Sequence, residues 1–461
     1  MLKETIFEHK RHFAEGAESE LRAQHNAMRR VTLLNGELTA NTRTDHAGVS
    51  ARVRRNGVYG FASIGDFSDA SIERVLQEAT SNATVLSNHA RSKQPPLPAP
   101  GTGMRPLIES FHDVEQRVYV ETCRAVDRYI TEHCPELISR VVLATSDTVE
   151  KVIATSDGYD AHVVIPRSYI YVVLTAMSKE GTPVEVFRPI GGYGTLDENF
   201  TDLEAAHAAV DQTYEHLMKK REAVYTEAGL KTVILSGTLA GMLAHEAVGH
   251  TVEADLVLGG SVAQHLMDQP VASEMVSLVD YAHTAFGKPA PLPVYVDDEG
   301  VVAEDAVLIE DGLLKGYMHN RESAEHFGTR PQGNARAWLF SDEPLIRMRN
   351  TAILPGNDTI EDMIASIDDG YYFMDTNNGQ ADTTGEFMFG VTVGYEIKNG
   401  KLGRAVFDTT ISGVAFDMLK TVDMLSADVE WASSGFCGKK QIMPVGLGGP
   451  AVRCQLTVGG R

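Results

Sequence analysis

Two histidines that flank a carboxylate are the side chains of this sequence whose types and spacing could do chemistry. They are His245, Glu246 and His250, in the segment His-Glu-Ala-Val-Gly-His that follows an apolar run. The segment differs by one inserted residue from H-E-x-x-H, in which two histidines on one helix face bind zinc and the glutamate is a general base. A metal site with hydrolytic chemistry is one interpretation. A chance pairing of two unrelated histidines at a helix end is the other.

The inserted residue changes the helix geometry that these side chains require. In a regular α-helix each residue advances by about 100°, so residues five positions apart point about 140° apart. One ion cannot readily reach both imidazoles from such positions. A π-bulge, which is a single turn with i→i+5 hydrogen bonds, brings the second histidine back beneath the first. Gly249 stands where this distortion is needed, and glycine tolerates it. The metal interpretation therefore predicts a π-bulge at this point.

A catalytic zinc site needs a third protein ligand and leaves its fourth position to water. Cys437 stands near two glycines and close to Lys439, whose charge would lower the pKa of the thiol. Cys454 alternates with apolar residues, so a buried strand position is the better interpretation for it. Glu253 follows His250 by three residues and could hydrogen-bond a ligand imidazole. The candidates stay open at this point, and they are Cys437, Cys454, Glu253, Asp255, His265 and His283.

The composition of the chain argues against several classes of protein. It has 461 residues, enough for two or three domains, and a formal net charge of -22 without a long run of basic residues. That charge repels a phosphate backbone, so we expect no nucleic-acid partner. We also expect neither a secretory signal nor a membrane span, because no suitable apolar stretch occurs. Four scattered cysteines are typical of the reducing cytoplasm, where a free thiolate can bind a metal.

The elements that must position the site begin with helices and hairpins. A helix is expected over 4–15, followed by strands over 18–63 whose Asn35-Gly36 and Asn56-Gly57 pairs are typical of type I′ hairpin turns. A helix over 68–88 and an irregular connection over 94–106 come next. Helix, strands and helix then recur from 114 to about 222, which suggests a structural duplication. Within this second half we expect turns at Ser146-Asp147 and Asp157-Gly158, and a capping box over 201–204.

A second domain is expected to begin near Lys231, where a buried strand over 232–235 precedes the helix with the two histidines. Downstream the pattern indicates mostly strands, with hairpin turns at Asp311-Gly312 and Asn399-Gly400. The predicted fold class is α+β. It comprises an N-terminal α/β domain with antiparallel sheets and a suggested duplication, and a C-terminal β-rich domain that carries the metal helix. We place these domains at 1–228 and 229–461.

Segments spread along the chain resemble the TldD/PmbA family, whose members were once called modulators of DNA gyrase. The resemblance covers nearly the full length, and it is most specific where HExxxH is linked to a later Cys-Gly-Lys. The matching segments are 48–63 (GVSARVRRNGVYGFAS), 245–255 (HEAVGHTVEAD), 333–334 (GN), 384–387 (TGEF), 411–413 (ISG), 435–439 (GFCGK) and 456–460 (LTVGG). Because the metal motif is kept, the chain resembles the active branch of the family.

The resemblance implies a zinc peptidase in which His245, His250 and Cys437 bind Zn²⁺ and Glu246 is the general base. It also implies a second subunit, which is either a PmbA/TldE-like paralogue in a heterodimer or another copy in a homodimer. The expected substrates are peptides or small unfolded proteins. The alternative function is a non-catalytic regulator or scaffold, in which the metal only ties the motif helix to the C-terminal segment. Four protein ligands would favour that alternative, whereas three ligands and a water would favour catalysis.

Overall fold

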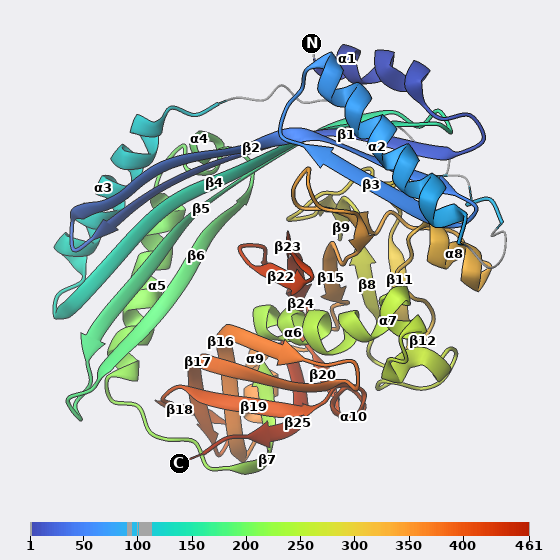
Figure 1. The fold of residues 1–461 in the computed structure, drawn as a ribbon. Helices are drawn as coiled ribbons and strands as arrows, with labels where there is room; N and C mark the ends of the chain where they lie inside the picture. The colour runs from blue at the N-terminus through green and yellow to red at the C-terminus, as the bar shows by residue number, and fades with distance from the viewer. Residues whose placement is uncertain (1, 90–94, 99, 101–112, 461) are drawn as a thin grey trace.

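A computed structural model describes residues 2–89, 95–98, 100 and 113–460 of the chain. Figure 1 shows a long curved sheet with helices on its outer face and a C-terminal part against its inner face. Helices and antiparallel sheets occur in both parts, so the predicted α+β class is confirmed. The stretch 94–106, expected to be irregular, lies mostly outside the described residues.

The N-terminal strands form one six-stranded antiparallel sheet in the order β3-β2-β1-β4-β5-β6. The predicted hairpin turns Asn35-Gly36 and Asn56-Gly57 have φ angles between 50 and 85°, as type I′ turns require, and are confirmed. The elements are α1 (Leu2–Glu8), the 3₁₀ helix η1 (His9–His12), β1 (Glu18–Leu34), β2 (Glu37–Arg55), β3 (Val58–Ile64), α2 (Asp69–Ser87), α3 (Gln116–His133), β4 (Leu137–Thr155), β5 (Ala161–Met177), β6 (Pro183–Tyr193), α4 (Leu196–Asn199) and α5 (Glu204–Lys220).

The expected repeat of helix, strands and helix is present in this part of the molecule. α1, three strands and α2 form one half, α3, three strands and α5 form the other, and the pairing of β1 with β4 fuses them into one sheet. Two local predictions are wrong. β4 runs straight through Ser146-Asp147, because Asp147 pairs there with the buried Arg167 of β5. The capping box belongs to Thr195 and Glu198 at α4, and at α5 the N–H of Glu204 donates to Oδ1 of Asp202 instead.

The alternation of side chains along the strands gives the sheet two different faces. Apolar residues of one face pack beneath the helices in two buried clusters. Polar residues of the other face bind the C-terminal part. Asn26 of β1 donates a hydrogen bond to the carbonyl of Trp338, and Lys151 of β4 pairs with the carboxylate of Asp298 at 2.8 Å. The sheet is therefore a platform for the C-terminal part.

The C-terminal part has two larger sheets. One has the order β16-β7-β25-β19-β17-β18, and because β16 also pairs with β17, five of its strands form a closed ring. The other has the order β12-β11-β8-β15-β24-β21. The helix α6 contacts strands of both sheets, which bury it. The predicted turns Asp311-Gly312 and Asn399-Gly400 have left-handed φ angles and are confirmed.

The bounds of the C-terminal elements are β7 (Gly229–Leu235), α6 (Gly237–Leu243), the π-turn η2 (Ala244–Val248), the 3₁₀ helix η3 (Gly249–Val252), α7 (Ala254–Leu258), the 3₁₀ helix η4 (Val262–His265), β8 (Leu278–Tyr281), β9 (Thr284–Ala285), β10 (Lys288–Pro289), β11 (Ala306–Glu310), β12 (Leu313–Leu314), α8 (Arg321–Phe327), β13 (Ala335–Arg336), β14 (Leu345–Ile346), β15 (Asn350–Ile353), α9 (Ile360–Ala365), β16 (Asp369–Ala381), β17 (Glu386–Lys398), β18 (Lys401–Ala405), β19 (Thr409–Val414), α10 (Ala415–Leu419), β20 (Met424–Leu425), β21 (Glu430–Ala432), β22 (Phe436–Lys439), β23 (Gln441–Pro444), β24 (Gly446–Gly449) and β25 (Val452–Val458).

Candidate metal centre

The helix that follows β7 changes its form where the two histidines lie. It widens from α6 into a π-turn over Ala244–Val248 and then tightens into the 3₁₀ helix η3. The N–H of Gly249 donates to the carbonyl of Ala244, five residues back. The predicted π-bulge is therefore confirmed. It brings the ring centroids of His245 and His250 to 5.2 Å from each other, with 78° between the ring planes.

Gly249 fits this position for a different reason from the one the sequence indicated. Its φ angle is −54°, an ordinary helical value, so the π-turn does not depend on the backbone freedom of glycine. The side chain of Met348 occupies the space that a Cβ atom would need. A Cβ atom at this position would lie 2.0 Å from the Sδ atom of Met348. Glycine thus lets the widened turn pack directly against Met348, which is itself buried.

Cys437 reaches the histidines from the far end of the chain. It lies on β22, which forms a tight hairpin with β23, and Lys440 occupies a left-handed turn position between them (φ 59°). The Sγ atom of Cys437 is 3.2 Å from the Nε2 atom of His250. One donor atom from each of His245, His250 and Cys437 lies within 4.8 Å of the other two. The structure therefore brings together three side chains that can share one ion.

The remaining ligand candidates lie elsewhere or contact the site indirectly. Cys454 is buried in the core of the C-terminal part, as its alternation with apolar residues indicated. His283 stacks on Tyr295, with 5.0 Å between ring centroids. Among the residues that the structure describes, neither His265 nor His283 belongs to a group of potential metal ligands. Glu253 and Asp255 are near the site, but Glu253 contacts the imidazole of His250 and Asp255 contacts Lys439.

Glu246 lies beside both imidazoles without being in the group of three. Its carboxylate oxygens are 3.9 Å from Nε2 of His245 and 3.7 Å from Nε2 of His250. The side chain of Glu246 is 20% exposed, whereas that of His245 is 1% exposed, so Glu246 borders the route to solvent. Burial raises the pKa of Glu246, and the nearby His250 partly opposes this rise. A carboxylate in this position can accept a proton from a molecule placed next to the ligands.

A carboxylate behind His250 fixes the orientation of that ring. The Nδ1 atom of His250 is 2.8 Å from Oε2 of Glu253, a fully buried side chain. Lys439 holds Glu253 in turn, with Nζ 3.2 Å from Oε2, and also pairs with Asp255 at 2.8 Å. The sequence suggested that Glu253 would hydrogen-bond a ligand imidazole. It also suggested that the charge of Lys439 would act on the thiol of Cys437, but the ammonium group of Lys439 pairs with Glu253 and Asp255 instead. A histidine held in this way presents Nε2 to a metal.

Arg347 was not singled out from the sequence, although it shapes the hairpin of Cys437. Its guanidinium is fully buried and donates to the carbonyls of Cys437 (2.8 Å) and Gln441 (2.8 Å), on opposite strands of the hairpin. Arg347 follows no motif and lies about ninety residues before Cys437, so no local pattern connects the two. Its charge also affects the imidazoles. Burial and the charges of His250, Arg347 and Arg336 lower the pKa of His245 well below its usual value.

The chemistry of the donor set fits a zinc ion. Both ring nitrogens of His245 are buried without a hydrogen-bond partner, and one oxygen of Glu253 is also unpaired. An unpaired buried imidazole is costly unless another group binds it. The lowered pKa keeps His245 neutral, which is the form that binds metals. Burial opposes protonation of His250, but Glu253 and Cys437 outweigh it and raise its pKa, so a metal must displace a proton there. Two imidazoles and a thiolate are typical zinc ligands.

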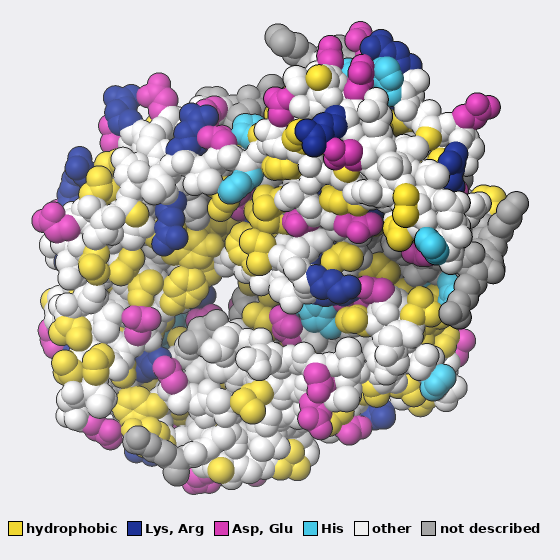
Figure 2. Space-filling model, viewed as in Figure 1, with side chains coloured by type: hydrophobic (Ala, Val, Ile, Leu, Met, Phe, Trp, Pro, Cys, Tyr) yellow, Lys and Arg dark blue, Asp and Glu magenta, His cyan; other side chains and the backbone are white. Residues whose placement is uncertain are grey.

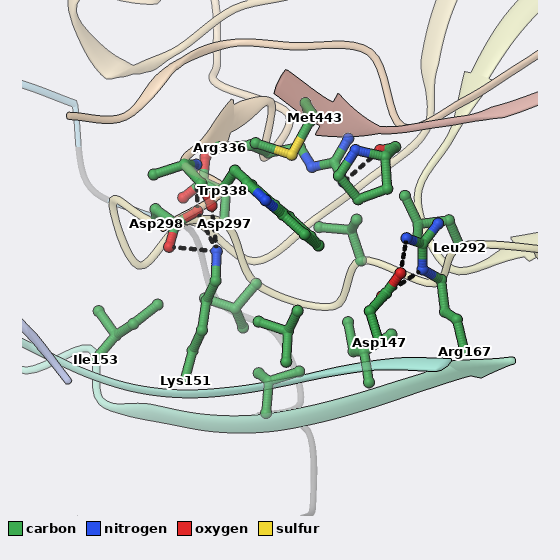
Figure 3. Close-up of a pocket in the computed structure, with 17 residues that line it drawn as sticks. Asp147, Lys151, Ile153, Arg167, Leu292, Asp297, Asp298, Arg336, Trp338 and Met443 are labelled. Carbon is green, nitrogen blue, oxygen red and sulfur yellow. Dashed lines mark hydrogen bonds and ion pairs between the residues drawn. The ribbon is translucent and has the colours of Figure 1, made fainter. Parts of the chain in front are cut away.

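A separate cavity of about 70 Å³ lies behind the Cys437 hairpin, between β4, β5 and the C-terminal part. Figure 3 shows Lys151 bound to Asp298 and Arg167 bound to Asp147. The rest of its wall is mainly apolar. The other two charged residues of its lining, Asp297 and Arg336, bond to backbone groups. The charged groups of this cavity are therefore already engaged in contacts within the protein. At the metal centre, by contrast, both ring nitrogens of His245 lack a partner.

An opening between the sheet and the C-terminal part is visible in Figure 2, with hydrophobic side chains along its border. The inner face of the sheet forms a groove of about 640 Å³ there, and its lining includes Leu143, Tyr171 and Phe187. The Tyr171 hydroxyl donates to the carbonyl of Ser434, three residues before Cys437. The groove is therefore linked to the segment that carries the thiol.

Comparisons with known proteins show the family to which the chain belongs. The sequence matches three consecutive profiles of one family: the PmbA/TldA metallopeptidase domain 1 over residues 19–83, the central domain over 110–218 and the C-terminal domain over 228–460. The chain belongs to the PmbA/TldA metallopeptidase family. The C-terminal match contains His245, Glu246, His250 and Cys437. The resemblance inferred from the sequence is therefore confirmed, and so is its assignment to a family of metallopeptidases.

Relatives of this family member carry names that agree with a metal-dependent protease. A metalloprotease of Methanocaldococcus jannaschii is 31% identical over 96% of this chain and 97% of its own length. A zinc metalloprotease TldD homologue of Saccharolobus solfataricus is 36% identical over 51% of this chain and 52% of its own. A metalloprotease TldD homologue of Haemophilus influenzae is 29% identical over 90% and 86%.

Solved structures share the fold of this family member along its whole length. TldE from Thermococcus kodakarensis superposes with a TM-score of 0.79 at 18% identity and covers 100% of both chains. A protein from Thermotoga maritima gives a TM-score of 0.79 at 20% identity, over 99% of this chain and 98% of its own.

Within the described residues, no helix has both the length and the apolar character that crossing a bilayer requires.

Proposed function

We propose that this member of the family is a zinc-dependent peptidase that hydrolyses peptide bonds in unstructured peptides or small unfolded proteins. His245, His250 and Cys437 would hold the ion, and Glu246 would be the general base. The observation that carries the proposal is the convergence of three donor atoms beside a carboxylate that is not itself needed as a ligand. Three ligands leave a coordination position for a reactant, in contrast to the four-ligand arrangement of a structural site.

The roles of the chain's own residues follow from their contacts. When bound, Zn²⁺ supplies Lewis acidity, which lowers the pKa of a water and polarises a carbonyl. Glu246 takes the proton of the attacking water and later gives it to the leaving nitrogen. Burial raises the pKa of Glu246 and so strengthens it as a base. Glu253 holds Nε2 of His250 towards the site, and Arg347 holds the Cys437 hairpin in place.

The substrate class is supported by the strands around the site. β22 and β23 pair only with each other among the described strands, and Phe436 and Ile442 expose 45% and 53% of their surface. An extended peptide can pair with a strand edge through its main chain, and such pairing selects extension more than sequence.

We propose a PmbA/TldE-like paralogue or a second copy as partner. A thiolate ligand and four free cysteines favour the cytoplasm as the compartment.

The test of the mechanism is the variant Glu246→Gln. It keeps the size of the side chain and removes the base, so we expect zinc content equal to that of the parent protein and a loss of peptide cleavage of at least 100-fold. Cleavage would be followed with an unstructured fluorogenic peptide, with and without a chelator. Glu215→Gln, on the exposed face of α5, is the matched control and should leave turnover unchanged. Undiminished turnover in Glu246→Gln would remove Glu246 from the mechanism, whereas a parent protein that binds zinc and cleaves no peptide would favour the scaffold alternative.

A further inference from the structure

A second group of potential metal ligands lies on the outer face of the N-terminal sheet. His9 and His12 are the first and last residues of the 3₁₀ helix η1. This helix has three residues per turn, so side chains three positions apart lie above one another. Their ring centroids are 5.6 Å apart, with 32° between the planes. Opposite them, Asp69 and Glu73 stand one turn apart at the start of α2 and face the same way.

The ring of His9 is oriented as a metal ligand would be. Its side chain is 2% exposed, and Nδ1 is 2.8 Å from the carbonyl oxygen of Thr5. A carbonyl only accepts hydrogen bonds, so Nδ1 carries the proton, and Nε2 is free to present a lone pair. The Nε2 atom is buried without a hydrogen-bond partner, and the nearest acidic oxygen, Oδ1 of Asp69, is 3.8 Å away.

The other donors of the set are His12, Glu73 and Asp69, with the guanidinium of Arg11 against one of them. Nε2 of His12 is 3.4 Å from Oε1 of Glu73, and it also accepts a hydrogen bond from Nε of Arg11 at 3.0 Å. Donor atoms of His9, His12 and Glu73 lie within 4.8 Å of one another. Arg11 is exposed and can turn away, and Asp69, which is 77% exposed, can turn inward. Lone pairs of two imidazoles and one or two carboxylates then point to a common centre.

We propose that His9, His12 and Glu73, with Asp69 as a fourth ligand, form a second Zn²⁺ site with a structural role. Imidazole and carboxylate ligands in a four-ligand set fit zinc. The ion would fasten the N-terminal segment α1–η1 to α2. Figure 1 shows both helices on the outside of the sheet, with the sheet between them and the β22–β23 hairpin, so this site and the catalytic centre are separate.

Metal counting in single-site variants tests this proposal. After dialysis against buffered Zn²⁺, we expect the parent protein to retain a second equivalent per chain. His12→Ala and Glu73→Gln should each lose the zinc equivalent of the outer site and keep peptidase activity. Cys437→Ser should keep the zinc equivalent of the outer site and lose the one at the metal centre. His46→Ala, an exposed histidine on β2, is the control and should change neither. Equal zinc content in His12→Ala and the parent protein would overturn the proposal.

A stability measurement separates a built site from adventitious binding and from simple ion pairing. In the Cys437→Ser background, added Zn²⁺ should raise the melting temperature, because an ion that binds only the folded state stabilises it. Adding His12→Ala to that background should abolish the rise. A rise that persists without His12, or that never occurs in Cys437→Ser, would show that the four side chains only form ordinary ion pairs.

Discussion

The Nδ1 atom of His250 and the Oε2 atom of Glu253 lie 2.8 Å apart, and the carboxylate is completely buried beneath the ring. This contact explains why an acidic residue stands three positions after the second histidine. It holds the ring so that Nε2 faces Cys437, and it makes the imidazole a stronger donor. Burying the charged carboxylate of Glu253 is energetically unfavourable. The positive charges of His250 and Lys439 offset this cost, as the lowered pKa of Glu253 indicates.

Replacing that carboxylate should weaken the metal centre without removing a ligand. We expect Glu253→Gln to lower zinc affinity by about 10- to 100-fold, because the amide holds the ring less firmly and has no charge. Competition with a chromogenic chelator measures this. Asp255→Asn is the matched control, since Asp255 shares the Lys439 contact but does not touch His250. An affinity for zinc that is equal in Glu253→Gln and the parent protein would contradict the role given to this contact.

Gly249 should be intolerant of even a methyl group. Gly249→Ala places a Cβ atom 2.0 Å from Sδ of Met348, and we expect a loss of about 1–3 kcal/mol in the free energy of unfolding, together with a lower zinc content. Urea unfolding and metal analysis measure the two effects.

The cause can be checked with a double-mutant cycle. Met348→Ala removes the clashing atom, so the double variant should be more stable than the sum of the two single losses predicts. Gly65→Ala is a control in which the new Cβ meets nothing closer than 3.6 Å. Strict additivity between Gly249 and Met348 would mean that the close approach does not set the requirement for glycine.

A buried histidine outside the metal centre should make stability depend on pH. Burial lowers the pKa of His319 to about 4, and its Nδ1 lies 3.0 Å from Oγ of Ser323. In the unfolded chain this group titrates near 6.5. As pH falls from about 6.5 to 4, His319 is therefore protonated in the unfolded chain but stays neutral in the folded protein. The free energy of unfolding falls across this window, by about 3 kcal/mol at most.

The variant His319→Gln isolates that contribution. Its free energy of unfolding should fall less than that of the parent protein between pH 7 and pH 4, with the difference developing across the stated window. Urea unfolding at closely spaced pH values gives both curves. His46→Gln, at an exposed position, should follow the parent protein. Parallel curves for His319→Gln and the parent protein would rule out His319 as the titrating group.

The sequence predicts the site as far as local rules reach. The i, i+5 spacing of His245 and His250 requires a widened turn, and the structure has one at that position. The Asn-Gly pairs predict the hairpins because two successive left-handed residues allow few other turns. The repeat of helix, strands and helix also follows from pattern alone. Its fusion into one sheet depends on the pairing of β1 with β4, which no local signal specifies.

The parts that sequence reasoning missed are set by contacts between distant segments. Residue patterns left six candidates for the third ligand, and only the family resemblance favoured Cys437. Arg347 bonds a hairpin about ninety residues away, and its role has no local signal. Asp147 was expected in a turn because of its residue type, but its pairing with buried Arg167 keeps it in mid-strand. In each case tertiary contacts outweigh local preference.

X-ray absorption at the zinc edge of the purified protein tests most directly whether His245, His250 and Cys437 share one ion. The second site proposed on the outer face has only nitrogen and oxygen ligands, so a sulfur signal reports only an ion bound by Cys437. The variant His12→Ala would be used to empty the outer site. We predict one sulfur scatterer at about 2.3 Å and nitrogen or oxygen scatterers at about 2.0–2.2 Å, with the sulfur lost in Cys437→Ser and retained in Cys454→Ser. A zinc spectrum without sulfur in the His12→Ala protein would contradict the account.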